Sequence, residues 1–343
     1  MPGWISATLG LTSLAAICAL LSYATNLLLM PAFQRYAMAR ANSRSSHVRP
    51  TPQGAGVAVM FAALAGICAI ACALPQFGLW SWRSGFLALA TIGLGVAGAI
   101  DDVRPLPVAP RLLVQVLAAS LGMTAIFAPA GVSIAGLPAW VTLGLLGLAL
   151  IWFVNLTNFM DGIDGITLAE FTPFCSAVAV MGAIGLAPLQ TGLIAAALLG
   201  GLLGFAPFNR HVARLFLGDA GSLTIGIVAG ILLLQLIQAG HPVAALILPL
   251  YHLADATLTL LGRLLRGERI TQAHRTHFYQ RATTLGWQVP AITSLVLRVN
   301  LVLGVLAICA AMVESPALQG LLLVAAAGLT AWLLRQLSES RPA

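Results

Sequence analysis

The sequence predicts an all-α protein that lies in a membrane and crosses it about 10–11 times. Hydrophobic residues make up 59% of the 343-residue chain, the mean hydropathy is +0.96, and 8% of the residues are charged, against about 25% in soluble domains. Eleven apolar runs are long enough for a helix to cross a hydrocarbon core, which takes roughly 17–25 residues. They cover about residues 4–30, 54–74, 78–100, 111–129, 136–154, 168–187, 189–207, 220–238, 242–262, 291–313 and 317–335.

The charged residues predict how this single membrane domain, residues 1–343, is oriented. All 17 basic residues are arginines, and they gather in alternate loops, the first of which holds Arg35, Arg40, Arg44 and Arg49. By the positive-inside rule these loops face the cytoplasm. We therefore expect any catalytic loops on the cytoplasmic face, at about residues 31–53, 101–111, 155–167, 208–219 and 263–290. Because the chain has no lysine, Schiff-base chemistry is excluded.

The stretch NLTNFMDGIDGIT, which follows an apolar run, is the first candidate for a functional site. Asn155, Asn158, Asp161 and Asp164 recur in it every three residues, so a helix end would place them along one side. Their oxygens suit Mg²⁺ and sugar hydroxyls. A carboxylate at mid-bilayer costs about 2.5–3.5 kcal/mol, which favours a place at the membrane face. A set of Asx turns with a helix cap at Thr167 is the structural alternative.

A pair of acids closes the third apolar run, in the stretch GAIDDVRPLPVAPRLLVQ. Asp101 and Asp102 are neighbours, and on a helix their side chains would point about 100° apart. One carboxylate could therefore hold a metal while the other serves as a base. The alternative is an anchor at the membrane edge, formed with Arg104.

The stretch RLFLGDAGSLTIG places Asp219 at the start of the eighth run. A helix N-terminus suits phosphate, and a bridging Mg²⁺ would explain why an acid stands there. As the alternative, Asp219 is simply the N-cap of its helix. Phe216, just upstream, could stack on a base or pack against its neighbours.

The longest polar segment is RLLRGERITQAHRTHFYQRATTLGW, which carries five arginines, among them Arg275 and Arg281. Arginine forks fit phosphate oxygens bidentately. His274 and His277, three residues apart, could bind phosphate on one face of a short helix. Zinc is disfavoured because no cysteine and no second histidine pair is near. An ordinary positive-inside loop explains part of the arginines but not the two histidines.

These four segments are expected on one side of the membrane, where they describe a pocket with aspartates for Mg²⁺ and arginines for a diphosphate. Such a pocket suits a nucleotide-activated donor and a lipid acceptor, and no nucleic acid. Two further ionisable residues, His252 and Asp255, lie inside the ninth run and could pair with Arg263 or line the pocket.

In this order, the four segments resemble the polyprenyl-phosphate N-acetylhexosamine-1-phosphate transferases, over about residues 95–285. The resemblance implies a multi-pass enzyme of the bacterial inner membrane that moves a sugar 1-phosphate from a UDP-amino sugar to undecaprenyl phosphate and releases UMP. It also implies Mg²⁺, which Mn²⁺ could replace. His-Arg-Thr-His in place of a triple histidine indicates the branch that starts O-antigen, the first membrane step of a surface polysaccharide.

The resemblance also implies roles for individual residues. It implies catalytic roles for Asp101, Asp102, Asp161, Asp164, His274 and His277. It implies metal binding by Asp219 and Asp161. Together with the residue patterns, this leads us to expect substrate binding by Asn155, Asn158, Arg111, Phe216, Arg275 and Arg281, with Arg111 standing where the family often has a lysine.

Two other classes of protein are weighed against this reading. A transporter or flippase for lipid-linked sugars would need polar residues at mid-span and paired repeats. A CDP-alcohol phosphatidyltransferase would need Ala-Arg soon after its first Asp-Gly, whereas GITLAEFTPF follows Asp164. The amino sugar, the polymer that is built, the choice between direct attack and a covalent intermediate, and homodimer formation stay open at this point.

Overall fold

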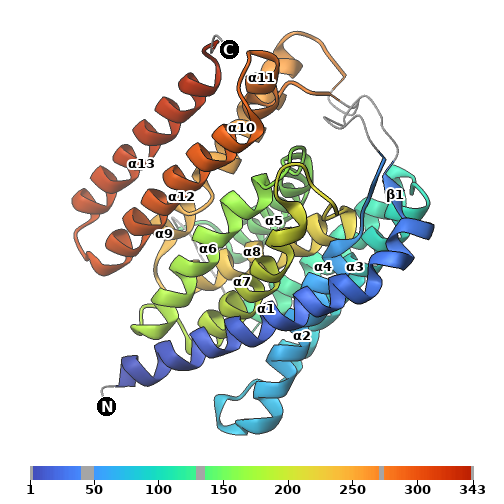
Figure 1. The fold of residues 1–343 in the computed structure, drawn as a ribbon. Coiled ribbons are helices and arrows are strands. Elements are labelled where there is room, and N and C mark those ends of the chain that lie inside the picture. The colour runs from blue at the N-terminus through green and yellow to red at the C-terminus, as the bar shows by residue number, and fades with distance from the viewer. Residues whose placement is uncertain (1–2, 40–49, 129–135, 270–273, 341–343) are drawn as a thin grey trace.

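The computed structural model describes residues 3–39, 50–128, 136–269 and 274–340, which form a bundle of helices (Figure 1). Within them, ten helices are long and apolar enough to cross a membrane, which confirms the prediction of an all-α polytopic protein. They are α1 (Gly3–Tyr36), α2 (Ala55–Ala73), α3 (Trp82–Val103), α4 (Val108–Phe127), α5 (Ala139–Phe159), α6 (Ile166–Ala183), α7 (Leu189–Asn209), α8 (Asp219–Gln238), α12 (Val289–Met312) and α13 (Pro316–Leu337). The shorter elements are β1 (Met38–Ala39), β2 (Thr51–Pro52), the 3₁₀ turn Pro75–Phe77, α9 (Pro242–Ile247), α10 (Leu250–Leu265) and α11 (Phe278–Thr284).

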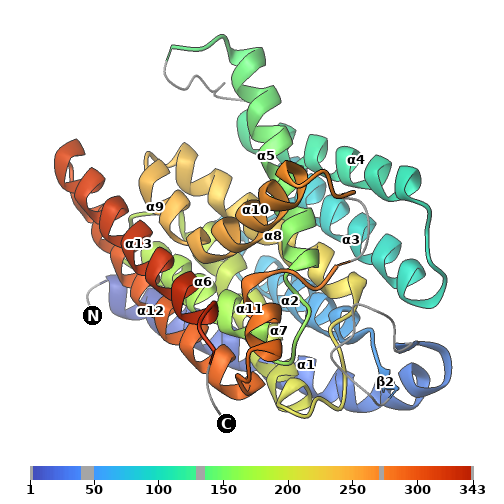
Figure 2. The ribbon, with the colours of Figure 1, turned by 90° about the horizontal axis from the view of Figure 1, so that it is seen from above.

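Three helices form the centre of the bundle. In α6, α7 and α8, 72–78% of the apolar stretch is buried, against 22–44% in the other seven long helices. Helix α1 packs along α7, α3 and α5 pack against α8, and α12 packs against α6. Figure 2 shows α3 and α4 on one side of this centre, and α12 and α13 on the other. The start of α8 therefore lies where several elements from the first half of the chain meet.

Glycines allow α2 and α3 to approach the first turn of α8 backbone to backbone. A Cβ on Gly56 in α2 would overlap the backbone nitrogen of Gly221. A Cβ on Gly98 in α3 would lie 2.5 Å from the backbone nitrogen of Ala220, closer than real Cβ atoms come. Only glycine, which has no Cβ, permits this approach. It brings the C-terminus of α3, which carries the paired acids, against the N-terminus of α8.

The prediction of one unbroken span over residues 242–262 is wrong, because two helices, α9 and α10, occupy it. The break falls at Leu248 and Pro249. Proline has no N–H to continue the helical hydrogen bonds, and the backbone leaves the helical conformation at Pro249 itself (φ −95°, ψ 17°). Helix α10 is amphipathic: it buries Tyr251, His252, Asp255 and Arg263, and it exposes leucines on another face.

The ends of two other helices differ from the predicted loops. Helix α3 continues to Val103, so the paired acids lie in its last turn, and α5 ends at Phe159. Asp161 and Asp164 therefore lie in the turn that follows α5, and the four polar residues of this stretch do not share one side of a helix. Residues 38–39 and 51–52 pair as a short antiparallel ribbon, which Gln53 joins to Phe216. Arg40, Arg44 and Arg49 lie outside the described residues.

The backbone contact between α2 and α8 can be tested with Gly56→Ala. We expect a lower melting temperature in detergent, because forcing an extra group into a packed interface costs about 1–3 kcal/mol. Gly93→Ala in α3 is the matched control, since a Cβ there has no atom within 4 Å. Equal melting temperatures for the two variants would contradict the contact.

Candidate active site

The polar residues of four segments meet around one cavity of about 570 Å³ at one end of the bundle. Its walls come from the last turn of α3, the end of α5 and the turn after it, the first turn of α8 and the segment before it. The β1–β2 region and residues 274–281, the histidine segment, complete the walls. Among the predicted site residues, the walls include Asp101, Asp102, Asn158, Asp161, Asp164, Phe216, Asp219 and His274. The expected convergence of the acidic segments is therefore present.

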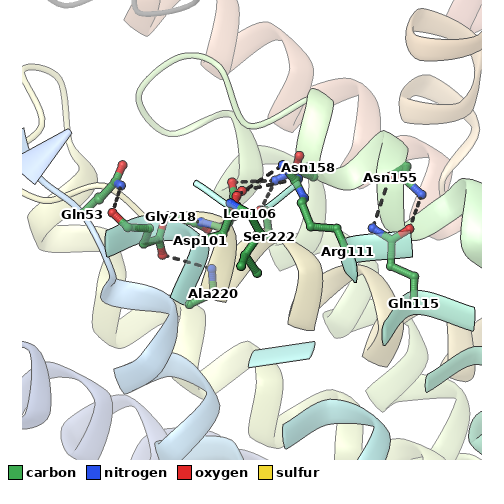
Figure 3. A network of polar contacts seen from close by, with 12 residues as sticks. Gln53, Asp101, Leu106, Arg111, Gln115, Asn155, Asn158, Gly218, Ala220 and Ser222 are labelled. Atoms are coloured by element: carbon green, nitrogen blue, oxygen red, sulfur yellow. Dashed lines mark hydrogen bonds and ion pairs between the residues drawn. The ribbon is translucent and has the colours of Figure 1, made fainter. Parts of the chain in front are cut away.

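Asp102 caps helix α8 from a different helix. Its Oδ1 accepts the backbone N–H of Asp219 (2.8 Å) and its Oδ2 accepts that of Ala220 (3.1 Å) (Figure 3). Gln53 donates through Nε2 to the backbone oxygen of Asp102 (2.9 Å). A Cβ on Gly218 would overlap the Asp102 carboxylate, so the residue before α8 has to be glycine. The sequence left open that Asp219 is the N-cap of its helix and that the paired acids anchor the membrane edge. The structure supports neither alternative, because Gly218 is the N-cap and Asp102 binds the first turn of α8.

Arg111 in α4 joins two acids that come from different helices. Its Nη1 lies 3.2 Å from Asp101 Oδ2, and its Nη2 lies 3.5 Å from Asp219 Oδ2. Asp101 Oδ1 accepts the backbone N–H of Leu106 (2.5 Å). The guanidinium charge offsets the repulsion between the two carboxylates and so keeps them on the same wall of the cavity.

The two asparagines of α5 have separate roles in the structure. Asn158 donates through Nδ2 to Asp219 Oδ1 (2.8 Å) and to Ser222 Oγ (2.9 Å), so it orients an acid of the cavity. Asn155, one turn earlier, donates to Gln115 Oε1 (2.8 Å) and accepts from Gln115 Nε2 (3.2 Å). This amide pair ties α5 to α4 (Figure 3), and Asn155 is not among the residues that line the cavity.

Asp161 lies in the turn between α5 and α6, outside the membrane-crossing segments. Its Oδ1 accepts the hydroxyl of Thr167 (2.5 Å), and the N-cap of α6 is Gly165, so the predicted cap at Thr167 is wrong. Burial raises the pKa of the Asp161 carboxyl group to about 6, because a desolvated environment disfavours the charged form. A bound cation would favour the carboxylate again.

Asp164 faces the cavity and also holds the segment after α7. It is almost fully buried, and its Oδ2 accepts the backbone N–H of Ala213 (3.0 Å) and lies 2.9 Å from His211 Nδ1. Asn209 accepts the backbone N–H of Gly165 (2.7 Å) beside it. The turn after α5 and the segment before α8 are thereby fixed to each other.

The two predicted histidines occupy different environments. His274 lines the cavity, and its Nδ1 lies 2.9 Å from the hydroxyl of Thr276. His277 is buried behind it, with 4.9 Å between the two ring centroids. Arg275 and Arg281 are exposed and are not among the residues that line the cavity. Of the four predicted residues in this segment, only His274 reaches the cavity directly.

Asp255 in α10 holds the histidine segment, a role that differs from both alternatives considered for it, pairing with Arg263 and lining the pocket. Its fully buried carboxylate accepts the backbone N–H groups of Phe278 (3.0 Å) and Tyr279 (3.3 Å) and the hydroxyls of Tyr251 and Thr259 (3.3 Å each). It also lies 3.2 Å from His277 Nδ1. The only signal in the sequence was an isolated acid inside an apolar run.

The other ionisable residues of α10 do not pair as the sequence suggested. His252 lies 3.1 Å from Glu170 of α6, and both side chains are buried. Arg263 pairs with Glu268 (2.7 Å). The expected pairing of His252 or Asp255 with Arg263 is therefore wrong.

The donor atoms of the cavity suit Mg²⁺. Within the described ranges, no group of three or more histidine, cysteine, aspartate or glutamate residues has the spacing of a metal site. Mg²⁺ commonly binds proteins through one or two carboxylates and takes its other ligands from water and substrate phosphates. The carboxylates of Asp219, Asp161 and Asp101, with the carboxamide of Asn158, supply such hard oxygen ligands. The residues present therefore fit this ion.

The sequence model of glycosyl transferase family 4 matches residues 84–237. The match covers less than half of the chain, and over these residues the sequence is similar to glycosyl transferase family 4. The matched part runs from α3 to α8 and contains every acid of the cavity wall, whereas α10 and the histidine segment lie beyond it.

Three proteins of similar sequence match part of the chain. A phospho-N-acetylmuramoyl-pentapeptide-transferase of Desulforudis audaxviator is 31% identical over 54% of this chain and 64% of its own length. A decaprenyl-phosphate N-acetylglucosaminephosphotransferase of Mycobacterium tuberculosis is 32% identical over 60% of this chain and 55% of its own length. The protein named "Probable undecaprenyl-phosphate N-acetylglucosaminyl 1-phosphate transferase" of Bacillus subtilis is 25% identical, over 78% of this chain and 76% of its own length. The chain thus spans between about half and three quarters of the lengths of these relatives.

The anchoring of the histidine segment can be tested with Asp255→Asn. Asparagine keeps the size of the side chain but replaces one acceptor oxygen with a donor. Because a hydrogen bond to a charged acceptor contributes about 1.5–3 kcal/mol, we expect the amides of Phe278 and Tyr279 to exchange hydrogen roughly tenfold faster or more. Hydrogen exchange followed by mass spectrometry measures this rate.

Glu268→Gln is the control for that experiment, since this exposed carboxylate pairs with Arg263 and Arg266 and not with the amides of Phe278 or Tyr279. It should leave the exchange of both amides unchanged. Unchanged exchange in Asp255→Asn would mean that the buried carboxylate does not hold α11.

Proposed function

We propose that the protein transfers the 1-phosphate of an N-acetylhexosamine or related amino sugar from its UDP derivative to undecaprenyl phosphate and releases UMP. The observation that carries the proposal is the meeting of Asp101, Asp161 and Asp219, from three separate segments, around one cavity. The names of the similar proteins, which specify a polyprenyl-phosphate acceptor and transfer of a sugar phosphate, agree with this reaction. Residues 84–237, which match the family model, include all three acids.

In the proposed reaction an oxygen of the lipid phosphate attacks the β-phosphorus of the UDP-sugar. The bond from that phosphorus to the oxygen bridging the two phosphates breaks, and UMP leaves with the electron pair. Both substrates are anions, so their approach has to be compensated by positive charge. Mg²⁺, when bound, supplies that charge and polarises the phosphate oxygens. Asp219 and Asp161 are the residues that we propose to hold it.

The contacts of the paired acids favour different roles for them. Both oxygens of Asp102 are occupied by backbone N–H groups of α8, so we assign it as a positioning residue. The Oδ2 atom of Asp101 pairs with Arg111, whose side chain can turn toward a phosphate. We therefore propose that Asp101 meets the lipid phosphate and accepts its proton, and that Arg111 contacts a phosphate group.

The sugar and the nucleotide are proposed to occupy the remaining walls. Phe216 has an aromatic face for the uracil ring, and His274 has a ring nitrogen for a phosphate or a sugar hydroxyl. The His-Arg-Thr-His pattern supports a place in the O-antigen-initiating branch. With the arginine-rich loops in the cytoplasm, the cavity opens on the cytoplasmic side of a bacterial inner membrane.

A transporter is the weaker candidate. The acids of the cavity gather at one end of the bundle, whereas a transport site would lie at mid-span between repeated halves. Two other buried ionisable residues, His252 and Glu170, lie against each other and are not among those that line the cavity.

Asp219→Asn is expected to abolish Mg²⁺-dependent release of UMP while the protein still inserts into membranes. The substitution removes the negative charge and leaves the side chain its size. The measurement is transfer of radiolabel from a UDP-amino sugar to undecaprenyl phosphate, with Glu339→Gln, an exposed acid that does not line the cavity, as control. Normal turnover by Asp219→Asn would refute its role.

Mg²⁺ binding can be measured without turnover. Titration with Mg²⁺ is expected to raise the melting temperature of the wild-type protein, because a ligand of the native state stabilises it. Asp219→Asn should lose most of that rise at the same ion concentration. An equal rise in both proteins would place the ion elsewhere.

A further inference from the structure

A second cavity, of about 430 Å³, lies on the other side of the histidine segment, between α10 and α11. Its walls include two arginines, two threonines and apolar groups. They are Arg266, Arg281, Thr259, Thr276, Leu258 and Phe278. None of these residues lines the first cavity, so the two cavities are separate sites.

The polar wall of this cavity has an excess of positive charge. The guanidinium of Arg281 lies 5.9 Å from the ring centroid of Phe278. Arg266 is more than half exposed, and its Nε lies 2.7 Å from Glu268. Glu268 is shared with Arg263 (2.7 Å), so one carboxylate serves two guanidiniums. Two arginines that face one hollow are suited to an anion with several oxygen atoms, such as a phosphate group.

The apolar wall continues onto a face of α10 that carries exposed leucines. Leu258, Leu261 and Leu265 are 50%, 48% and 80% exposed. They follow one another at helical spacing toward the end of α10 where the arginines lie. In a protein that spans a membrane, such leucines contact lipid chains. The cavity thus has a charged end beside a surface suited to hydrocarbon.

We propose that this cavity binds the phosphodiester headgroup of an anionic bilayer phospholipid, with the acyl chains along the leucines of α10. The phosphate would lie between Arg266 and Arg281, the two cations of the polar wall. Free phosphate would use the arginines but not the leucines, and a zwitterionic lipid would bring its own cation to the arginines. Charge and hydrocarbon together select an anionic lipid.

The bound lipid would touch the segment that carries His274. Thr276 lines the second cavity, and its hydroxyl lies 2.9 Å from His274 Nδ1. The same short segment therefore forms the wall between the lipid site and the first cavity. The lipid site does not depend on the proposed transferase activity, because binding can be measured without turnover.

The test uses the full-length protein, stripped of lipid in detergent and then mixed with phosphatidylglycerol or phosphatidylcholine of the same chain length. Native mass spectrometry counts the lipid that stays bound. The wild-type protein should retain phosphatidylglycerol in preference to phosphatidylcholine. The double variant R266Q/R281Q should bind it roughly thirtyfold more weakly, about fivefold for each arginine lost. R335Q, an exposed arginine on α13, should bind like the wild type.

Three results would overturn the proposal. One is equal retention of the two lipids by the wild-type protein, and another is unchanged retention of phosphatidylglycerol by the double variant. The third is displacement of phosphatidylglycerol by an equal concentration of glycerol 3-phosphate or undecaprenyl phosphate, which would assign the cavity to a free phosphate or to the acceptor. Should R266Q/R281Q fail to fold, each single variant must show its fivefold loss.

Discussion

The junction between the end of α3 and the start of α8 determines the arrangement of the site. Asp102 accepts two backbone N–H groups that α8 cannot satisfy within itself, and Gly98 lets the two backbones come close enough for these bonds. As a result Asp101, one residue earlier, and Asp219, the first residue of α8, stand on the same wall of a cavity. A helix cap, which is usually a local device, here joins residues more than a hundred positions apart and brings acids together.

Bringing acids together creates an electrostatic cost that the rest of the site offsets. Arg111 lies between Asp101 and Asp219, and Asn158 donates to Asp219 from a third helix. Burial still raises the pKa of the Asp161 carboxyl group to about 6, so this part of the cavity favours the arrival of positive charge. A divalent cation would meet that need.

Much of the fold and part of the site could be predicted from the sequence, because apolar length and charge placement are local properties. The long helices and the shared cavity of Asp101, Asp161 and Asp219 are of this kind. The pairing of Asn155 with Gln115 depends on a contact between helices that are apart in the sequence, and no local pattern reveals it. Asp255 was missed for the same reason, since its partners Phe278 and Tyr279 lie more than twenty residues further on.

The central claim is that acids from distant segments hold one divalent ion in the first cavity. Anomalous X-ray scattering from crystals grown with Mn²⁺ and UMP tests it most directly, because manganese can be located by its own signal. We expect one anomalous peak inside the cavity, in contact with the carboxylate of Asp219 and beside Asp161. A bound manganese ion outside this cavity, or inside it but in contact with neither acid, would contradict the claim.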